Sequence, residues 1–398
     1  MFDNIPMILA ALVFVGVYAV LVLEKFNRAV VSLLGACILI FLGVLNQEQA
    51  INGIDFNTIG LLVGMMLIVA ISQKTGMFQY LAIKSAKAVK GEPWRVLVML
   101  AVVTASLSAL LDNVTTVLLI VPVTLVITDE LKLNPYPFLF TQIFASNIGG
   151  TATLIGDPPN IMIGSAVGLT FMDFVINVAP VIPVIMFATF LPLKFIYGSK
   201  MKVSDEDKKR IMEFREDDAI TDGALLRKCL FVLGIVILGF FFHGVLHLES
   251  ATIALFGAAL LLIITNSEVH EVFGKVEWVT IFFFIGLFVV VEGLVETGVI
   301  KLLAEKMVHF TGGDLSNTTI LILWVSAIAS AIVDNIPFVA TMIPMIKEMG
   351  ATMGGADKIL PLWWALSLGA CLGGNGTIIG ASANVIVAGF SERAGYPI

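Results

Sequence analysis

Long apolar runs dominate the chain and are separated by short polar segments. A helix needs roughly 20 apolar residues to cross about 30 Å of hydrocarbon. The strict alternation of apolar and polar positions that marks membrane β-strands does not occur in these runs. The pattern therefore predicts an all-α polytopic membrane protein. The runs with few or no charges are 5–23, 29–45, 57–73, 174–193, 229–246, 251–265 and 278–291.

Composition excludes a soluble globular protein, since 58% of the residues are hydrophobic and 13% are charged, with a mean hydropathy of +1.00. No basic segment precedes the first apolar run, which follows Asp3 and is therefore interpreted as a span and not as a cleavable signal peptide. We expect the lipid bilayer as the main partner and no nucleic acid. The three cysteines, Cys37, Cys229 and Cys371, have neither metal nor disulfide spacing, so no bound metal is expected.

The sequence repeats itself. The stretch SALLDNVTTVLLIVP (108–122) aligns with SAIVDNIPFVATMIP (330–344), and the same shift places Gly64 on Gly286. With two residues inserted, NIGGTATLIGDPPN (147–160) matches CLGGNGTIIGASAN (371–384). The chain is therefore predicted to hold two copies of one unit, residues 1–197 and 228–398, joined by the polar linker 198–227.

Each unit contains two interrupted elements. In 94–128 the apolar run breaks at Asp112-Asn113, and its second arm is too short to cross the bilayer, which predicts a re-entrant hairpin. The second hairpin is expected at 316–346, and broken helices at 136–168 and 360–395. A full unit then crosses the membrane an odd number of times, so the second copy must be inverted, as in many secondary transporters. The second copy lacks a counterpart of the last span, and we expect this sequence to be truncated.

Basic residues indicate the orientation. With the linker 198–227 in the cytoplasm, all but four of the 23 lysines and arginines fall on the cytoplasmic side. The N-terminus is then outside, and the protein is expected in the inner or plasma membrane of a prokaryotic cell. The four exceptions are Lys301, Lys306, Lys347 and Lys358.

Candidate chemistry begins at the two hairpin tips. A charged side chain at the bilayer centre costs about 2.5–3.5 kcal/mol on insertion scales, so Asp112 and Asp334 are expected to face a wet cavity or an ion. They could bind a cation or exchange a proton, and either could also cap the following helix. Neighbouring neutral oxygens are predicted from Asn113, Thr115, Thr116 and Asn335.

The broken helices supply the second part of the predicted site. Their glycines would let backbone approach a ligand, and their half-helix ends would favour ions. Asp157 has no counterpart in the second copy, where Ala381 stands, and could be a cap, a charge-selective group or a proton carrier. Glu292 could be a proton relay or could simply reach the interface. The remaining predicted lining residues are Asn147, Gly149, Gly150, Thr151, Thr153, Asn160, Gly373, Gly374, Asn375, Thr377 and Asn384.

The stretches SALLDNVTT, SNIGGTATLIGDPPN, VDNIPFVATMIP and GACLGGNGTIIGASAN resemble signatures of the arsenite-efflux permease and NhaD-type antiporter group of the ion transporter superfamily. Within that group they are most similar to the melanosomal P-protein branch. The resemblance implies an elevator-type transporter fold, in which hairpins and broken helices form a mobile domain on a dimerising scaffold. It thus implies a homodimer.

The predicted function is secondary active transport of a small inorganic ion or metalloid, either arsenite and antimonite or sodium, in exchange for protons. No cofactor is expected beyond a coupling Na⁺ or H⁺. Sodium-coupled carboxylate transport and a P-protein-like anion channel or pH regulator are alternatives, although the tip carboxylates would repel a dianion. An intramembrane aspartyl protease built on Asp112 and Asp157 lacks the GxGD pattern, so no enzyme activity is expected. A passive channel is a further alternative.

Overall fold

The computed structural model describes residues 4–23 and 25–398, so Asp3 lies outside the described part. These residues form helices joined by turns, with no strand among them. Seven helical segments in the described part are long and apolar enough to cross a membrane, which confirms the predicted all-α polytopic fold class. They are Ile5–Val22, Phe56–Gln73, Asn113–Glu130, Phe171–Tyr197, Gly223–Leu246, Trp278–Glu296 and Leu315–Ile332. The expectation that the second arm of 94–128 is too short to cross a membrane is wrong, because that arm continues to Glu130; the re-entrant hairpin itself stays a prediction.

The helices before the linker begin where the sequence supplies caps or prolines. Asn27 accepts a hydrogen bond from the Ala29 amide, Asp55 accepts from two amides of the next helix, and Pro93 and Pro158 occupy first-turn positions. The elements are α1 (Ile5–Val22), α2 (Arg28–Phe41), α3 (Gln47–Asn52), α4 (Phe56–Gln73), α5 (Met77–Ala88), α6 (Pro93–Ser108), α7 (Asn113–Glu130), α8 (Tyr136–Gly150), α9 (Pro158–Val167), α10 (Phe171–Asn177), η1 (Ala179–Val181) and α11 (Ile182–Tyr197).

The linker and the second half are also helical. Asp222 caps the first long helix of this half by accepting from two of its amides. The elements are α12 (Asp205–Glu213), η2 (Glu216–Ala219), α13 (Gly223–Leu246), α14 (Ser250–Thr265), α15 (Val269–Phe273), α16 (Trp278–Glu296), α17 (Val299–Thr311), α18 (Leu315–Ile332), α19 (Asn335–Met353), α20 (Leu360–Gly373), η3 (Gly374–Gly376), η4 (Ile378–Gly380) and α21 (Ser382–Arg393).

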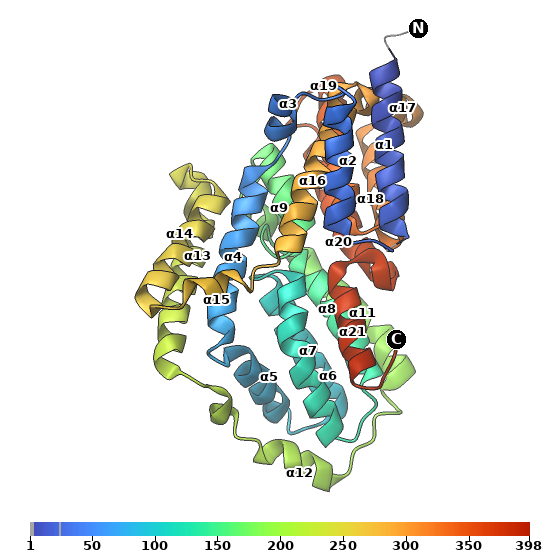
Figure 1. Ribbon diagram of the computed structural model, residues 1–398. Helices are drawn as coiled ribbons and strands as arrows, with labels where there is room; N and C mark the ends of the chain where they lie inside the picture. The colour runs from blue at the N-terminus through green and yellow to red at the C-terminus, as the bar shows by residue number, and fades with distance from the viewer. Residues whose placement is uncertain (1–3, 24) are drawn as a thin grey trace.

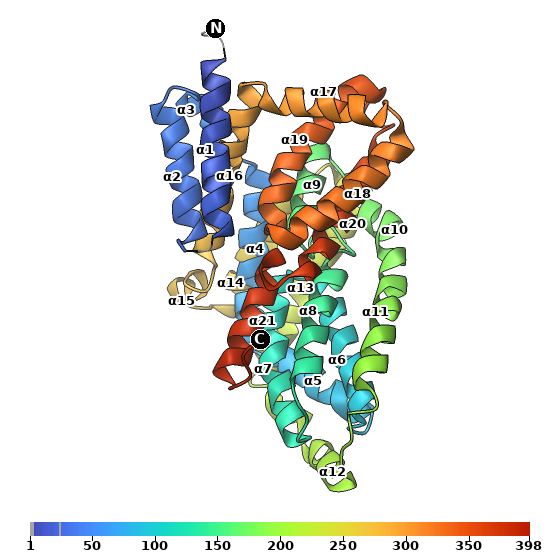
Figure 2. The same ribbon diagram turned by 90° about the vertical axis from the view of Figure 1, so that its right-hand side faces the viewer.

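Two helix pairs approach the middle of the molecule from opposite ends. The pair α6 and α7 occupies the lower part of the molecule and α18 and α19 the upper part, in both views (Figures 1 and 2). Each pair turns at its tip, around 109–112 and 333–334. Beside them, α8 and α9 are interrupted at 151–157, and α20 and α21 are interrupted by η3 and η4. The tips and the interruptions therefore meet at the centre.

The remaining long helices pack crosswise between the two halves. Helix α4 packs on α14, and α16 packs on α2. Glycines permit both contacts, because a Cβ on Gly64 would lie 2.7 Å from the carbonyl carbon of Ala254, and one on Gly286 would lie 2.6 Å from the Leu33 amide. The division at 1–197 and 228–398 into inverted units stays a prediction.

The linker is fastened to the base of the first hairpin. Asp207 forms an ion pair with Lys132 (2.9 Å), and Lys208 forms one with Glu92 (3.0 Å). Lys87 pairs with Glu216. Helix α12 and the start of α1 lie at opposite ends of the molecule (Figure 1). Which end faces the cytoplasm stays a prediction.

Candidate functional site

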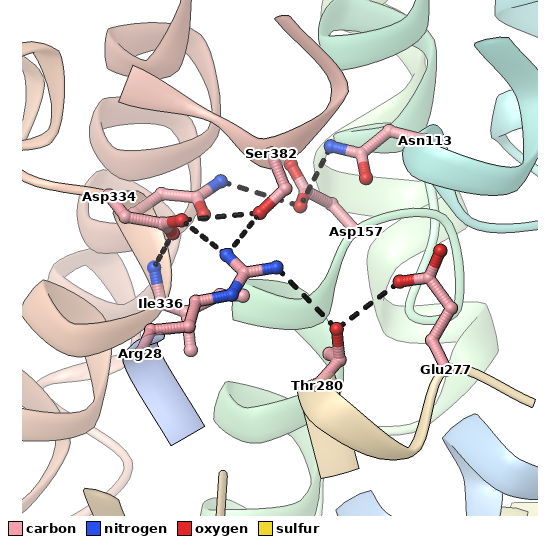
Figure 3. Close-up of polar contacts among 9 residues, drawn as sticks. Arg28, Asn113, Asp157, Glu277, Thr280, Asp334, Ile336 and Ser382 are labelled. Atoms are coloured by element: carbon pink, nitrogen blue, oxygen red, sulfur yellow. Dashed lines mark hydrogen bonds and ion pairs between the residues drawn. The ribbon is translucent and has the colours of Figure 1, made fainter. Parts of the chain in front are cut away.

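Asp157 lies at the centre of the molecule, directly before α9, and is fully buried. Its Oδ1 accepts hydrogen bonds from Nδ2 of Asn113 (3.3 Å) and Nδ2 of Asn335 (3.4 Å), the two residues that follow the tip aspartates. Its Oδ2 has no hydrogen-bond partner among the described residues. The side chain makes no capping bond to α9, so its contacts are those of a site residue and not of a cap (Figure 3).

A small cavity of about 20 Å³ adjoins Asp157. A space of that size holds one water molecule or one small ion. Three carboxylates and one guanidinium line it. Its polar lining residues are Arg28, Asp112, Asn113, Asp157, Glu277, Thr280, Asn335 and Ser382.

Asparagine side chains connect the two interrupted helices. Nδ2 of Asn147 donates to Oδ1 of Asn375 and to Oδ1 of Asn384, each over 3.0 Å. Oδ1 of Asn147 accepts from Nδ2 of Asn113 over 3.2 Å, which joins this network to Asp157. The predicted residues Asn113, Asn147, Asn375 and Asn384 are thus brought together.

The two interruptions are held by equivalent asparagines. Nδ2 of Asn160 donates to the carbonyls of Thr151 and Thr153, and Nδ2 of Asn384 donates to those of Gly374 and Thr377. The Thr377 carbonyl also accepts from the Gly380 amide over 3.3 Å. The two asparagine side chains therefore hold the backbone of the interruptions in place.

The predicted threonines attach the interruptions to the hairpin tips. Oγ1 of Thr153 donates to the carbonyl of Ala109, and Oγ1 of Thr377 donates to that of Ala331, each over 2.5 Å. Oγ1 of Thr151 donates to the carbonyl of Asn147. These hydroxyls therefore position backbone and do not point into the cavity.

The predicted glycines face protein backbone. A Cβ on Gly149 would lie 2.3 Å from the Ala105 carbonyl oxygen, and one on Gly373 would lie 2.5 Å from that of Ala327. Gly150 likewise contacts the backbone of Gly156, and Gly374 contacts the backbone of Gly380, which lie in the same interrupted helices. We expected these glycines to let the backbone come close to a ligand. In the structure they instead let two helices come close to each other.

Both tip aspartates cap the helix that follows them. Oδ1 of Asp112 accepts from the Thr115 amide (2.8 Å), while Asp334 accepts from the Ile336 amide (3.1 Å). The hydroxyl of Thr115 donates to the second oxygen of Asp112. The buried hydroxyl of Thr116 has no partner among the described residues. Asp334 also forms an ion pair with Arg28 over 3.1 Å, whereas Asp112 forms no ion pair with any of the described residues.

Four residues of the site were missed by the sequence interpretation. Nη1 of Arg28 donates to Oγ of Ser382 over 2.7 Å, and Nη2 donates to Oγ1 of Thr280 over 3.5 Å. Oγ1 of Thr280 donates to Oε2 of Glu277 over 3.2 Å (Figure 3). Arg28 lies between the apolar runs 5–23 and 29–45, and the sequence interpretation counts it only among the basic residues of the cytoplasmic side. The repeat aligns Thr280 with Thr58, and this match is the feature of the sequence that could have pointed to Thr280.

A wider cavity of about 320 Å³ adjoins the small one. The two share Arg28, Glu277 and Ser382 in their linings. Leu21 and Phe283 supply apolar walls of the wider space.

Glu292 lies away from both cavities. It is about three helical turns beyond Thr280 on α16. Its side chain packs against Gly53, where an added Cβ would lie 2.7 Å from it. The structure therefore does not bring Glu292 to the other proton-coupling candidates.

Comparison with known proteins supplies the family. A family model described as "Citrate transporter" (CitMHS) matches residues 18–369. An uncharacterized transporter of Mycobacterium tuberculosis is 45% identical over 98% of this chain and 92% of its own length. The human P protein is 34% identical over 98% of this chain, which spans 56% of that protein's length. The YdaH transporter of Alcanivorax borkumensis superposes with a TM-score of 0.49, 14% identity and coverage of 88% of this chain and 83% of its own.

The matching family and the mycobacterial relative are described as transporters and not as enzymes, which sets aside the intramembrane protease. The similarity to P proteins is confirmed. The arsenite-efflux and NhaD-type subgroup stays a prediction.

Proposed function

The chain belongs to the CitMHS citrate transporter family, and we propose that it is a secondary transporter that exchanges a small inorganic cation for protons at Asp157. The exchange requires a group that can hold either a cation or a proton in turn. A carboxylate at membrane depth is such a group.

One observation carries the proposal. Asp157 is fully buried, and its Oδ2 has no partner among the described residues but borders a cavity of about 20 Å³. A buried charged oxygen without a partner is costly, so a bound cation or a proton is the natural means of neutralising it. Asn113 and Asn335 satisfy only the other oxygen.

The available ligands favour a hard cation such as Na⁺. Asp112, Asp157 and Glu277 offer carboxylate oxygens to the cavity. Arsenite bound as a trithiolate would need three cysteines. Within the described part Cys371 is near Asn160, whereas Cys37 is exposed on α2 and Cys229 is buried on α13. Sodium is therefore favoured over arsenite.

The inverted repeat and the elevator-type movement belong to the same proposal. Helix pairs that approach from opposite ends, and the crosswise packing of α4 on α14 and α16 on α2, support it. The cytoplasmic position of the linker and the homodimer stay predictions.

Flux in proteoliposomes tests the exchange. Purified protein is given an imposed pH gradient, with sodium, lithium, arsenite and citrate offered in turn. We expect saturable, gradient-driven sodium or lithium flux that Asp157→Asn reduces to the level of empty vesicles. Asp129→Asn, on the exposed end of α7, is the matched control and should transport normally. Full flux in Asp157→Asn would overturn the proposal.

Carboxylate transport is the second candidate. The description of the family and the presence of Arg28 in a cavity of about 320 Å³ favour it. Against it, Arg28 is already paired with Asp334, and Asp112, Asp157 and Glu277 lie around it. Citrate flux that survives Asp157→Asn would favour this second function over cation exchange.

A further inference from the structure

We propose that Arg28 is a gate residue: its ion pair with Asp334 closes the passage between the wider cavity and Asp157, and uptake of a cation or proton by Asp334 opens it. This inference rests on the proposed exchange at Asp157. It assigns the control of that site to a side chain from another part of the fold.

The position of the guanidinium is the first argument. Arg28, Glu277 and Ser382 line both the cavity of about 320 Å³ and the cavity of about 20 Å³ that borders Asp157. A cation that passes from the wider space to Asp157 must therefore pass these side chains. Arg28 carries the one positive charge among them.

The contacts of Arg28 form the second argument. The side chain starts at the first turn of α2 and donates to Asp334 before α19, to Ser382 at the start of α21 and to Thr280 on α16. Its guanidinium also lies 5.4 Å from the centroid of the Phe283 ring. One side chain thus connects four elements (Figure 3). A shift of α19 relative to α2 breaks the ion pair with Asp334, and a shift of α21 breaks the hydrogen bond to Ser382.

Electrostatics gives the gate its sensitivity. Arg28 attracts Asp334, which is the tip carboxylate in direct contact with it. Glu277, Asp112 and Asp157 also face this region from α16, α7 and α9. A cation or proton on Asp334 removes that attraction, and the guanidinium is then released from its position between the two cavities. While it stays, it repels an entering cation.

The position equivalent to Arg28 in the second half of the chain carries no charge. The shift that aligns Ala29 with Ala251 places Arg28 on Ser250. Ser250 lines another cavity, of about 310 Å³, together with Leu61. Among the described residues, none that lines that cavity also lines the small one. The charged gate is therefore a property of one side of the centre.

Transport kinetics are the first test. We expect Arg28→Ser to lower the KM for sodium at least about tenfold and to permit downhill sodium flux without a pH gradient, because the repelling charge is gone. Arg28→Lys keeps the charge and should retain a wild-type KM and tight coupling, although kcat falls because the ammonium group cannot make all the hydrogen bonds of the guanidinium. Asp334→Asn should leak as Arg28→Ser does. A merely structural role would lower kcat in Arg28→Ser and Arg28→Lys alike with KM unchanged, and that result would overturn the gate.

Accessibility is the second test and does not depend on the transported ion. Met66→Cys places a thiol at the small cavity, in a background carrying Cys37→Ser. A positively charged methanethiosulfonate should label it about tenfold faster when Arg28→Ser is added, whereas Ser250→Ala should change nothing. Equal labelling rates would overturn the gate even if Asp157→Asn abolishes flux. Faster labelling would support it even if no cation–proton exchange is found.

Discussion

Asn147 and Asn384 join the two interrupted helices directly, since Nδ2 of the first donates to Oδ1 of the second over 3.0 Å. Asn384 also donates from its own Nδ2 to the carbonyls of Gly374 and Thr377. All polar atoms of its side chain are thus used inside the fold, where it is 1% exposed. Hydrogen bonds between neutral side chains thus join the two interrupted helices beside the buried Asp157, whose Oδ2 has no partner among the described residues.

Removing this asparagine should destabilise the protein. Asn384→Ala removes the side-chain donor of the buried Gly374 carbonyl, at about 1–3 kcal/mol for an unsatisfied buried group, and also removes one of the two acceptors of the Asn147 amide. We expect a clearly lower melting temperature in detergent, and a similar loss for Asn160→Ala, which frees the carbonyls of Thr151 and Thr153. Asn317→Ala, on an exposed part of α18, is the control and should melt as wild type. Unchanged melting of both buried variants would show that the carbonyls find other partners.

Gly149→Ala should prevent α8 from packing on α6. The added methyl group would lie 2.3 Å from the Ala105 carbonyl oxygen, and backbone cannot yield as a side chain can. We expect a strong loss of folded protein in size-exclusion chromatography, and the same for Gly373→Ala. Gly389→Ala on α21 has no atom within 4 Å of its added Cβ and should fold normally. Normal yields of all three variants would contradict the close packing.

The sequence predicted much of this centre. The broken run at Asp112-Asn113 predicted the turn that precedes α7, and the interrupted element expected at 136–168 corresponds to α8 and α9. Asp157 was identified because no counterpart matches it. These features depend on neighbouring residues in the sequence and on the internal repeat, and both can be recognised in a single sequence.

Other features depend on contacts across the fold. Arg28 and Asp334 are 306 residues apart in the sequence, so nothing local predicts their ion pair. A basic residue that follows an apolar run is typical of a loop between membrane spans. The glycines of the interruptions show that backbone comes close, but not whether it approaches a ligand or a helix. Only the packing of α6 on α8 and of α18 on α20 decides that.

Docking of the linker should depend on pH through Asp207. The Ser204 hydroxyl donates to its carboxylate over 2.6 Å and Lys132 lies 2.9 Å away, and both lower the pKa of Asp207. The unfolded value is about 3.9, so this stabilisation is fully present above about pH 4 and is lost as the pH falls through the lower folded value. We expect pepsin to cleave the linker increasingly fast below about pH 4. Asp207→Asn should be cleaved quickly already at about pH 5, whereas the exposed Asp205→Asn should not.

Gly76→Ala should release the linker from α5. Gly76 has φ +75°, and a Cβ there would lie 1.7 Å from the Ala219 carbonyl oxygen in the linker. Gly298 precedes α17 with nearly the same φ, +80°, but its nearest neighbour for a Cβ is 3.7 Å away. Both variants carry the backbone strain of a left-handed alanine. Trypsin at neutral pH should therefore cut the linker of Gly76→Ala much faster than that of Gly298→Ala. Equal cutting would exclude the clash.

The attachment of the linker has a practical consequence for single-molecule work. The Thr221 amide donates to the Thr75 carbonyl, and Asp207 pairs with Lys132 at the base of α7, so α12 follows the first hairpin as one rigid piece. A dye on the exposed Glu206, paired with a second dye on the exposed His270 of α15, would then act as a ruler outside the apolar part of the fold. Fluorescence transfer between them would count the conformations of one molecule in real time without a label in the transport path.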